Sequence, residues 1–143
     1  MKIPSLALVL ALWMGAAAAQ TPALTVNSAW IRVTPGSDVA SVYLTLVNPG
    51  KKPITIVSVE SPVAGHAMVH ETRIEGGIAR MRPVDRITVA PGKTVVFQPE
   101  GLHIMLHGVT QKLAVGQSVP LVLQFSDGAS MHLNATVRPL TEE

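Results

Sequence analysis

Cysteine is absent from all 143 residues of the chain. This absence excludes disulfides, thiolate zinc sites, thiol nucleophiles and blue-copper centres, all of which need cysteine. It also leaves no cysteine that could carry a lipid anchor. Without disulfides to stabilise it, the folded chain is expected to be held together by its hydrophobic core alone.

Charged residues are also scarce, at 14% of the chain, and the formal net charge is +2. No basic cluster is longer than Lys51-Lys52. Nucleic-acid binding depends on a concentrated basic surface. The charge pattern therefore argues against nucleic acid as a partner.

A third absence is a hydrophobic run long enough to cross a bilayer, which takes about 20 apolar residues. The apolar run Leu6–Met14 follows a single basic residue, Lys2, and precedes Ala17-Ala18-Ala19. This order is typical of a cleavable secretory signal. We predict a signal peptide over residues 1–19 and one domain over residues 20–143, located in the periplasm without a membrane anchor.

The chain does contain a regular alternation of β-prone segments and turns. Segments rich in Val, Ile, Leu and Thr are separated by turn residues such as Asn48-Pro49-Gly50, Gly76-Gly77 and Asp127-Gly128. This rhythm, without any long amphipathic helix, predicts an all-β sandwich or barrel. The expected strands are Thr25–Val33, Val39–Asn48, Ile54–Glu60, His66–Ile74, Ile78–Arg82, Arg86–Val89, Lys93–Gln98, Leu102–His107, Ser118–Phe125 and Ser130–Val137.

Histidines and methionines recur at two-residue spacing in two of these strands. Alternate side chains of a strand point to the same face. One strand therefore presents His66, Met68 and His70 together, and the other presents His103, Met105 and His107. In the second strand Leu102, Ile104 and Leu106 already supply the apolar face, so the histidines and methionine on its other face need another explanation.

The same rule separates Met131 from His132, which are neighbours and must point in opposite directions. Met131 shares its face with the apolar residues Leu133, Ala135 and Val137. We expect Met131 to lie in the core and His132 to face solvent.

Hairpin geometry places Met81. A tight turn at Gly76-Gly77 pairs Ile74 with Ala79 and Thr72 with Met81. Met81 then lies on the His70 face, one diagonal step from His70, at a Cα separation of about 7 to 8 Å. A slip of one residue would move Met81 to the other face.

Two imidazoles and two thioethers form a soft, uncharged ligand set, which selects Cu(I) over hard cations and zinc. We therefore predict one Cu(I) per chain, bound by His70, Met81, His103 and Met105. The alternatives are that Met81 fills the core and that His70 and His103 are ordinary polar residues at strand ends. Three further residues are interpreted as surface or pocket lining, with a secondary ligand role left open: His66, Met68 and His107.

Two other classes of function compete with metal binding. One is a metal-free secreted β-sandwich that binds protein or polysaccharide. The other is a hydrolase, but the chain has no Gly-x-Ser-x-Gly elbow, and we predict that it is not an enzyme.

The spacing of these residues resembles that of the PCuAC family of bacterial periplasmic copper chaperones. His70 is followed by ten residues, Met81, twenty-one residues and then His103-Ile104-Met105, as in the family signature of His, Met and His-x-Met. Flanking blocks also look like family blocks: Ala29-Trp30-Ile31-Arg32, Ala40-Ser41-Val42-Tyr43-Leu44, His70-Glu71-Thr72, Met81-Arg82-Pro83-Val84 and Val119-Pro120-Leu121.

The resemblance implies a cupredoxin-like Greek-key β-sandwich or barrel of about nine to ten strands. It also implies a monomeric carrier that binds Cu(I) at an exposed site and supplies copper to the Cu(A) centre of cytochrome c oxidase, alongside Sco-type thiol proteins. The chain departs from the family pattern in two places. His107 stands where a Met or aliphatic residue is expected, and the tail Arg138–Glu143 lacks a His/Met-rich extension.

Overall fold

The computed structural model describes residues 24–141, so the predicted signal peptide lies outside the described residues. Within this range no helix has the length and hydrophobicity of a membrane-crossing segment. The described chain is all-β, as predicted. Its strands are β1 (Thr25–Val33), β2 (Ala40–Val47), β3 (Ile54–Glu60), β4 (Ala64–Glu75), β5 (Ile78–Pro83), β6 (Ile87–Val89), β7 (Thr94–Phe97), β8 (Leu102–Val109), β9 (Ser118–Phe125) and β10 (Ser130–Val137).

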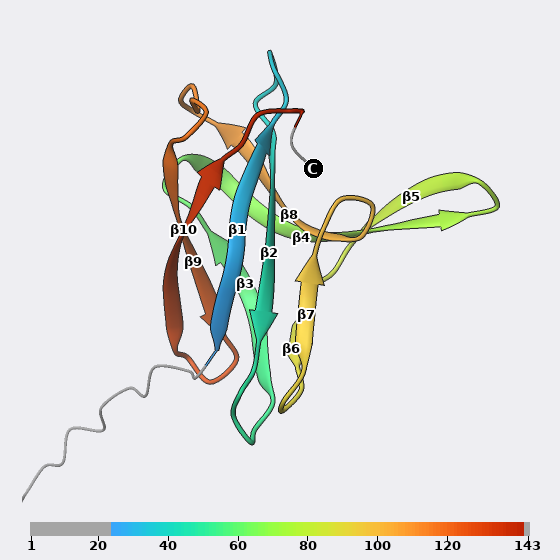
Figure 1. Cartoon of the computed structure of the whole chain (residues 1–143), viewed down its shortest axis with the longest axis vertical. Coiled ribbons are helices and arrows are strands. Elements are labelled where there is room, and N and C mark those ends of the chain that lie inside the picture. The colour runs from blue at the N-terminus through green and yellow to red at the C-terminus, as the bar shows by residue number, and fades with distance from the viewer. Residues whose placement is uncertain (1–23, 142–143) are drawn as a thin grey trace, which may run out of the picture.

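The ten strands form one hydrogen-bonded sheet in the order β5-β4-β8-β7-β2-β1-β10-β9-β3-β6, with a further pairing between β8 and β2. Pairings are antiparallel except for β1 with β10 and β7 with β8, which are parallel. The sheet curls so that β9 and β10 lie across from β2 and β8 (Figure 1). The predicted fold class, a cupredoxin-like β-sandwich, is confirmed.

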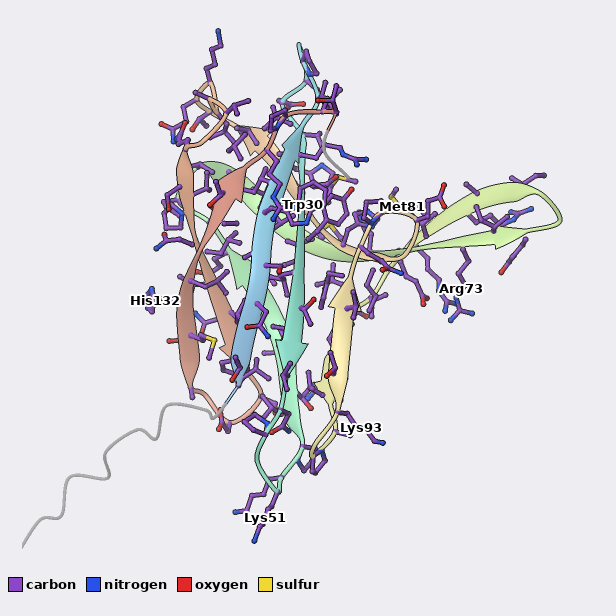
Figure 2. All side chains as sticks on the ribbon, viewed as in Figure 1. Trp30, Lys51, Arg73, Met81, Lys93 and His132 are labelled. Carbon is purple, nitrogen blue, oxygen red and sulfur yellow. The ribbon has the colours of Figure 1, made fainter. Side chains whose placement is uncertain are left out.

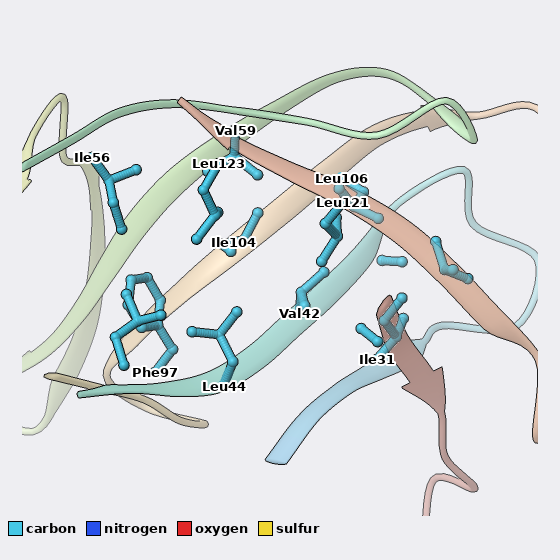
Figure 3. Close-up of a cluster of buried hydrophobic side chains, with 14 of the residues drawn as sticks. Ile31, Val42, Leu44, Ile56, Val59, Phe97, Ile104, Leu106, Leu121 and Leu123 are labelled. Carbon is cyan, nitrogen blue, oxygen red and sulfur yellow. The ribbon is translucent and has the colours of Figure 1, made fainter. Parts of the chain in front are cut away.

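The core lies between the two halves of the curled sheet (Figure 3). From β8, Ile104 and Leu106 point inward and are almost fully buried. From β9, Leu121 and Leu123 meet them on the opposite side. Burial of apolar surface is the main favourable term in folding. Here every second side chain of β8 and β9 points into the core and contributes to that buried surface. The core needs none of the histidines on β4 and β8.

The last strand follows the same alternation. Met131 packs against the core, whereas His132 is exposed. Both predictions for this pair are confirmed.

The β4–β5 hairpin extends away from the body of the sheet (Figure 1). Its turn residues, Gly76 and Gly77, have φ angles of 58° and 78°, a region that glycine enters without steric cost. The register pairs Ile74 with Ala79 and Thr72 with Met81. The hairpin prediction is therefore confirmed, and Met81 shares a face with His70.

Candidate metal centre

Strands β4 and β8 bring the two sets of histidines and methionines together. Directly opposed residues of an antiparallel pair lie on the same face of the sheet. The register therefore places both sets on one face, as three successive cross-strand pairs. These pairs are His66 with His107, Met68 with Met105, and His70 with His103.

Met81 reaches the same face from β5 through its pairing with Thr72. Its side chain is 54% exposed, so the alternative that Met81 fills the core is wrong. Figure 2 shows Met81 near the place where the hairpin leaves the body of the sheet. We refer to His66, Met68, His70, Met81, His103, Met105 and His107 together as the His/Met face.

His103 is the most buried member of the His/Met face, at 5% exposure. Its Nδ1 lies 3.1 Å from the carbonyl oxygen of Gly101. A carbonyl can only accept a hydrogen bond, so Nδ1 carries a proton, and the neutral form of this tautomer has its free lone pair on Nε2. The same carbonyl accepts a 3.0 Å hydrogen bond from the backbone N–H of Thr72. One peptide group thus fixes the imidazole of His103 and the strand that carries His70.

His70 faces the His103 ring edge-on, with 5.8 Å between the ring centroids. Its Nδ1 is buried and has no hydrogen-bond partner among the described residues. Burial, and then the proximity of His103 and His107, lower the pKa of His70. The imidazole is therefore held neutral near pH 7, which is the form that binds a metal ion.

Met105 has a polar contact that was not predicted from the sequence. Ser41, its partner on β2, directs its hydroxyl to the Met105 sulfur at 3.8 Å. A thioether sulfur is only a weak acceptor, so the contact orients Met105 and leaves a lone pair for a metal. Alternation along β2 could have revealed Ser41, because Val42 and Leu44 are buried in the core and Ser41 must point away from it.

His107 lies closer to the predicted ligands than its position in the strand suggests. Its ring centroid is 6.1 Å from that of His70, and its Nε2 is buried without a hydrogen-bond partner in residues 24–141. His66 stacks on it at 4.7 Å. These two residues belong to the same face as the predicted ligands.

Aromatic side chains close one side of the His/Met face. The Tyr43 ring lies 6.4 Å from His103, and Trp30 lies 4.5 Å from Tyr43. The guanidinium groups of Arg32 and Arg138 lie over the Trp30 ring at 5.6 and 5.1 Å. His103 is thus shielded from water on this side, while Met68 and Met81 remain open on the other.

The donor set favours a soft metal ion. Among residues 24–141, no group of three or more His, Asp or Glu side chains is arranged to hold a metal. A metal on the His/Met face would therefore need thioether sulfur in addition to imidazole. Thioethers select Cu(I) over zinc and hard cations.

A cavity of about 840 Å³ lies elsewhere. It is bordered by residues 33–40, by residues 109–113 with Val115, and by residues 137–140. No member of the His/Met face lines it.

A family model described as "Putative lipoprotein LpqE-like" matches residues 24–137. A curated relative, "Putative lipoprotein Lxx21020" from Leifsonia xyli subsp. xyli, is 30% identical over 128 residues, which cover 85% of this chain and 76% of the relative. A second relative, "Uncharacterized protein RP573" from Rickettsia prowazekii, is 28% identical over 99 residues and is covered over 55% of its length.

Solved structures with the same fold include apo-DR1885 from Deinococcus radiodurans, which is 31% identical, with a TM-score of 0.66 and coverage of 99% of this chain and 96% of that one. Its Cu(I) form is 31% identical, with a TM-score of 0.66 and coverage of 90% and 85%. The copper-bound PCuAC domain from PmoF2 is 20% identical, with a TM-score of 0.69 and coverage of 83% and 95%, and shows the fold alone. The chain belongs to the LpqE-like family and has the fold of PCuAC domains, which confirms the family resemblance found in its sequence.

Proposed function

We propose that this protein is an extracytoplasmic copper carrier that binds one Cu(I) through His70, Met81, His103 and Met105. The observation that carries the proposal is the cross-strand pair His70–His103, which has Met105 and Met81 on the same face of the sheet. A solved relative of 31% identity is a Cu(I) form, which supports the choice of metal.

The exposure of the four ligands suits a carrier more than a permanent metal site. His103 is buried at 5% and its Nδ1 is fixed by Gly101, whereas Met81 is 54% exposed on a projecting hairpin. A ligand from a partner can displace the exposed thioether while both imidazoles still hold the ion. Copper then leaves by stepwise exchange, with no change of oxidation state.

Met81→Leu tests the proposal because it keeps the side-chain volume and removes the sulfur. We expect Cu(I) affinity to fall at least about tenfold, equivalent to about 1.4 kcal/mol, in competition with a Cu(I) chelator. Met81 is exposed, so the melting temperature of the apo protein should not change. Met131→Leu is the matched control, since that methionine packs against the core and should not affect affinity.

The result also separates this proposal from a metal-free interaction module. If the purified protein fails to compete with the chelator and carries no copper from copper-fed cells, the interaction module is favoured. If Met81→Leu and Met131→Leu bind Cu(I) equally well, the proposed ligand set is wrong.

The proposed acceptor is the Cu(A) centre of cytochrome c oxidase, reached directly or through a Sco-type thiol protein. The family resemblance supports this route. Mixing the Cu(I)-loaded protein with an apo Cu(A) domain or an apo Sco-type protein, followed by separation and metal analysis, measures the transfer. Retention of all copper by the carrier in both mixtures would contradict the route.

A further inference from the structure

The His/Met face has an internal symmetry, and the proposed Cu(I) site involves the donors of only one half of it. Strand β4 reads His66-Ala67-Met68-Val69-His70, and strand β8 reads His103-Ile104-Met105-Leu106-His107. Both are His-x-Met-x-His, and they pair in antiparallel register with Met68 opposite Met105. An antiparallel pair has a local twofold axis between opposed residues. This axis exchanges the pair His70–His103 with the pair His66–His107.

The second half of the ladder repeats the donors of the first. His66 and His107 supply two imidazoles, and Met68 supplies a thioether that corresponds to Met105 by the local axis. The two rings are stacked, with centroids 4.7 Å apart and planes 8° apart. Met68 is 38% exposed and His66 is also exposed, so this end of the face is open to an incoming ion.

An independent observation points to a ligand at this end. The Nε2 atom of His107 is buried and has no hydrogen-bond partner among residues 24–141. Leaving a buried polar atom unpaired costs free energy, and nearly all such atoms in proteins have a partner. A soft cation bound between His107 and His66 would supply that partner after the exposed His66 ring turns to direct its lone pair at the ion.

We infer that the His/Met face holds a second, weaker Cu(I) position formed by His66, Met68 and His107. This inference rests on the proposed copper binding and extends it. The second position lacks a counterpart of Met81 and of the Gly101 contact that fixes His103, which explains its lower affinity. The ring centroids of His107 and His70 are 6.1 Å apart, so the two positions are neighbours.

The test is an anaerobic titration of the purified protein with Cu(I) against chelators of graded affinity. We expect one tightly bound equivalent and a second that is bound at least about tenfold more weakly. His66→Gln and Met68→Leu, each made separately, should abolish binding of the second Cu(I) equivalent or weaken it at least about tenfold. Binding of the first, tight Cu(I) equivalent should be unaffected in both variants. Two variants outside the face serve as matched controls, His132→Gln and Met131→Leu, and should retain both equivalents.

Other outcomes overturn the inference and separate it from the proposed function. A single equivalent that is weakened by Met81→Leu leaves the carrier proposal standing and removes the second position. A second equivalent that is unaffected by His66→Gln and Met68→Leu places it elsewhere on the molecule. Absence of any Cu(I) binding contradicts both proposals. Melting temperatures confirm that each variant is folded.

Discussion

Glu71 lies on the back of the β4–β5 hairpin, one residue from His70 and on the opposite face of the strand. Its Oε2 accepts hydrogen bonds from Arg82 at 2.9 Å and from Arg73 at 3.0 Å. Those bonds, first from Arg82 and then from Arg73, lower the pKa of Glu71 below its ordinary value of 4.5. One face of the hairpin therefore carries the ion pairs of Glu71 with Arg73 and Arg82, and the other face carries His70 and Met81.

We predict that Arg82→Gln raises the pKa of Glu71 toward its ordinary value. A carboxylate with a lowered pKa contributes stability above its unfolded pKa, and that contribution is lost as pH falls through the folded pKa. The variant should therefore lose less stability than the wild type between pH 5 and the folded pKa of Glu71. Carbon-detected NMR titration of the Glu71 carboxyl measures the shift, and an unchanged pKa would contradict the pairing.

At the scale of the element, the hairpin register decides whether Met81 can act as a ligand. Gly77 has a φ of 78°, and a Cβ added there would meet nothing within 4 Å. A side chain at this position would therefore cost free energy only through the positive φ angle of the backbone, by about 1 kcal/mol. Such a change perturbs the hairpin without a steric clash.

We predict that Gly77→Ala weakens Cu(I) binding about fivefold. The backbone penalty of about 1 kcal/mol lowers the fraction of molecules in which the hairpin holds Met81 in register, and the apparent affinity falls with that fraction. Chelator competition measures the effect, and combining Gly77→Ala with Met81→Leu should produce little further loss. Gly128→Ala is the matched control, since Gly128 has a φ of 87° and equally open surroundings in the β9–β10 turn. An equal loss of affinity in the control would show that the effect does not act through the hairpin.

At the scale of the whole molecule, one buried polar side chain lies at the opposite end of β2 from the His/Met face. Asn48 is fully buried at the end of β2. Its side-chain amide donates to the carbonyls of Lys52 at 2.7 Å and Val89 at 2.9 Å, and its oxygen accepts from the N–H of Gly50 at 3.0 Å. It lies seven residues along from Ser41, roughly 24 Å at the rise of an antiparallel strand.

We predict that Asn48→Ala lowers the free energy of unfolding by about 2 to 4 kcal/mol, because buried carbonyls lose their donors. Cu(I) affinity of the folded variant should remain at the wild-type value. Urea denaturation and chelator competition measure the two quantities. A loss of affinity at temperatures where the variant is folded would show that the two regions are coupled.

Local patterns were enough to predict the strands and the faces they present. The strand ends predicted from turn residues lie within two residues of the observed strand ends in all ten strands. The two-residue turn at Gly76-Gly77 fixed the position of Met81, because a hairpin register depends only on the turn and its flanking strands. The opposite directions of Met131 and His132 likewise followed from alternation within one strand.

The tertiary structure alone decided how the two His/Met strands meet. Met68 and Met105 are opposed because β4 and β8 pair across a long stretch of intervening sequence, and no turn residue sets such a register. It follows from burying Ile104 and Leu106 in the shared core. The same long-range packing brought Ser41 to Met105 and His107 to His70. The amino-acid sequence thus determined which donors the protein carries and which strand faces present them, whereas core packing decided which donors share a site.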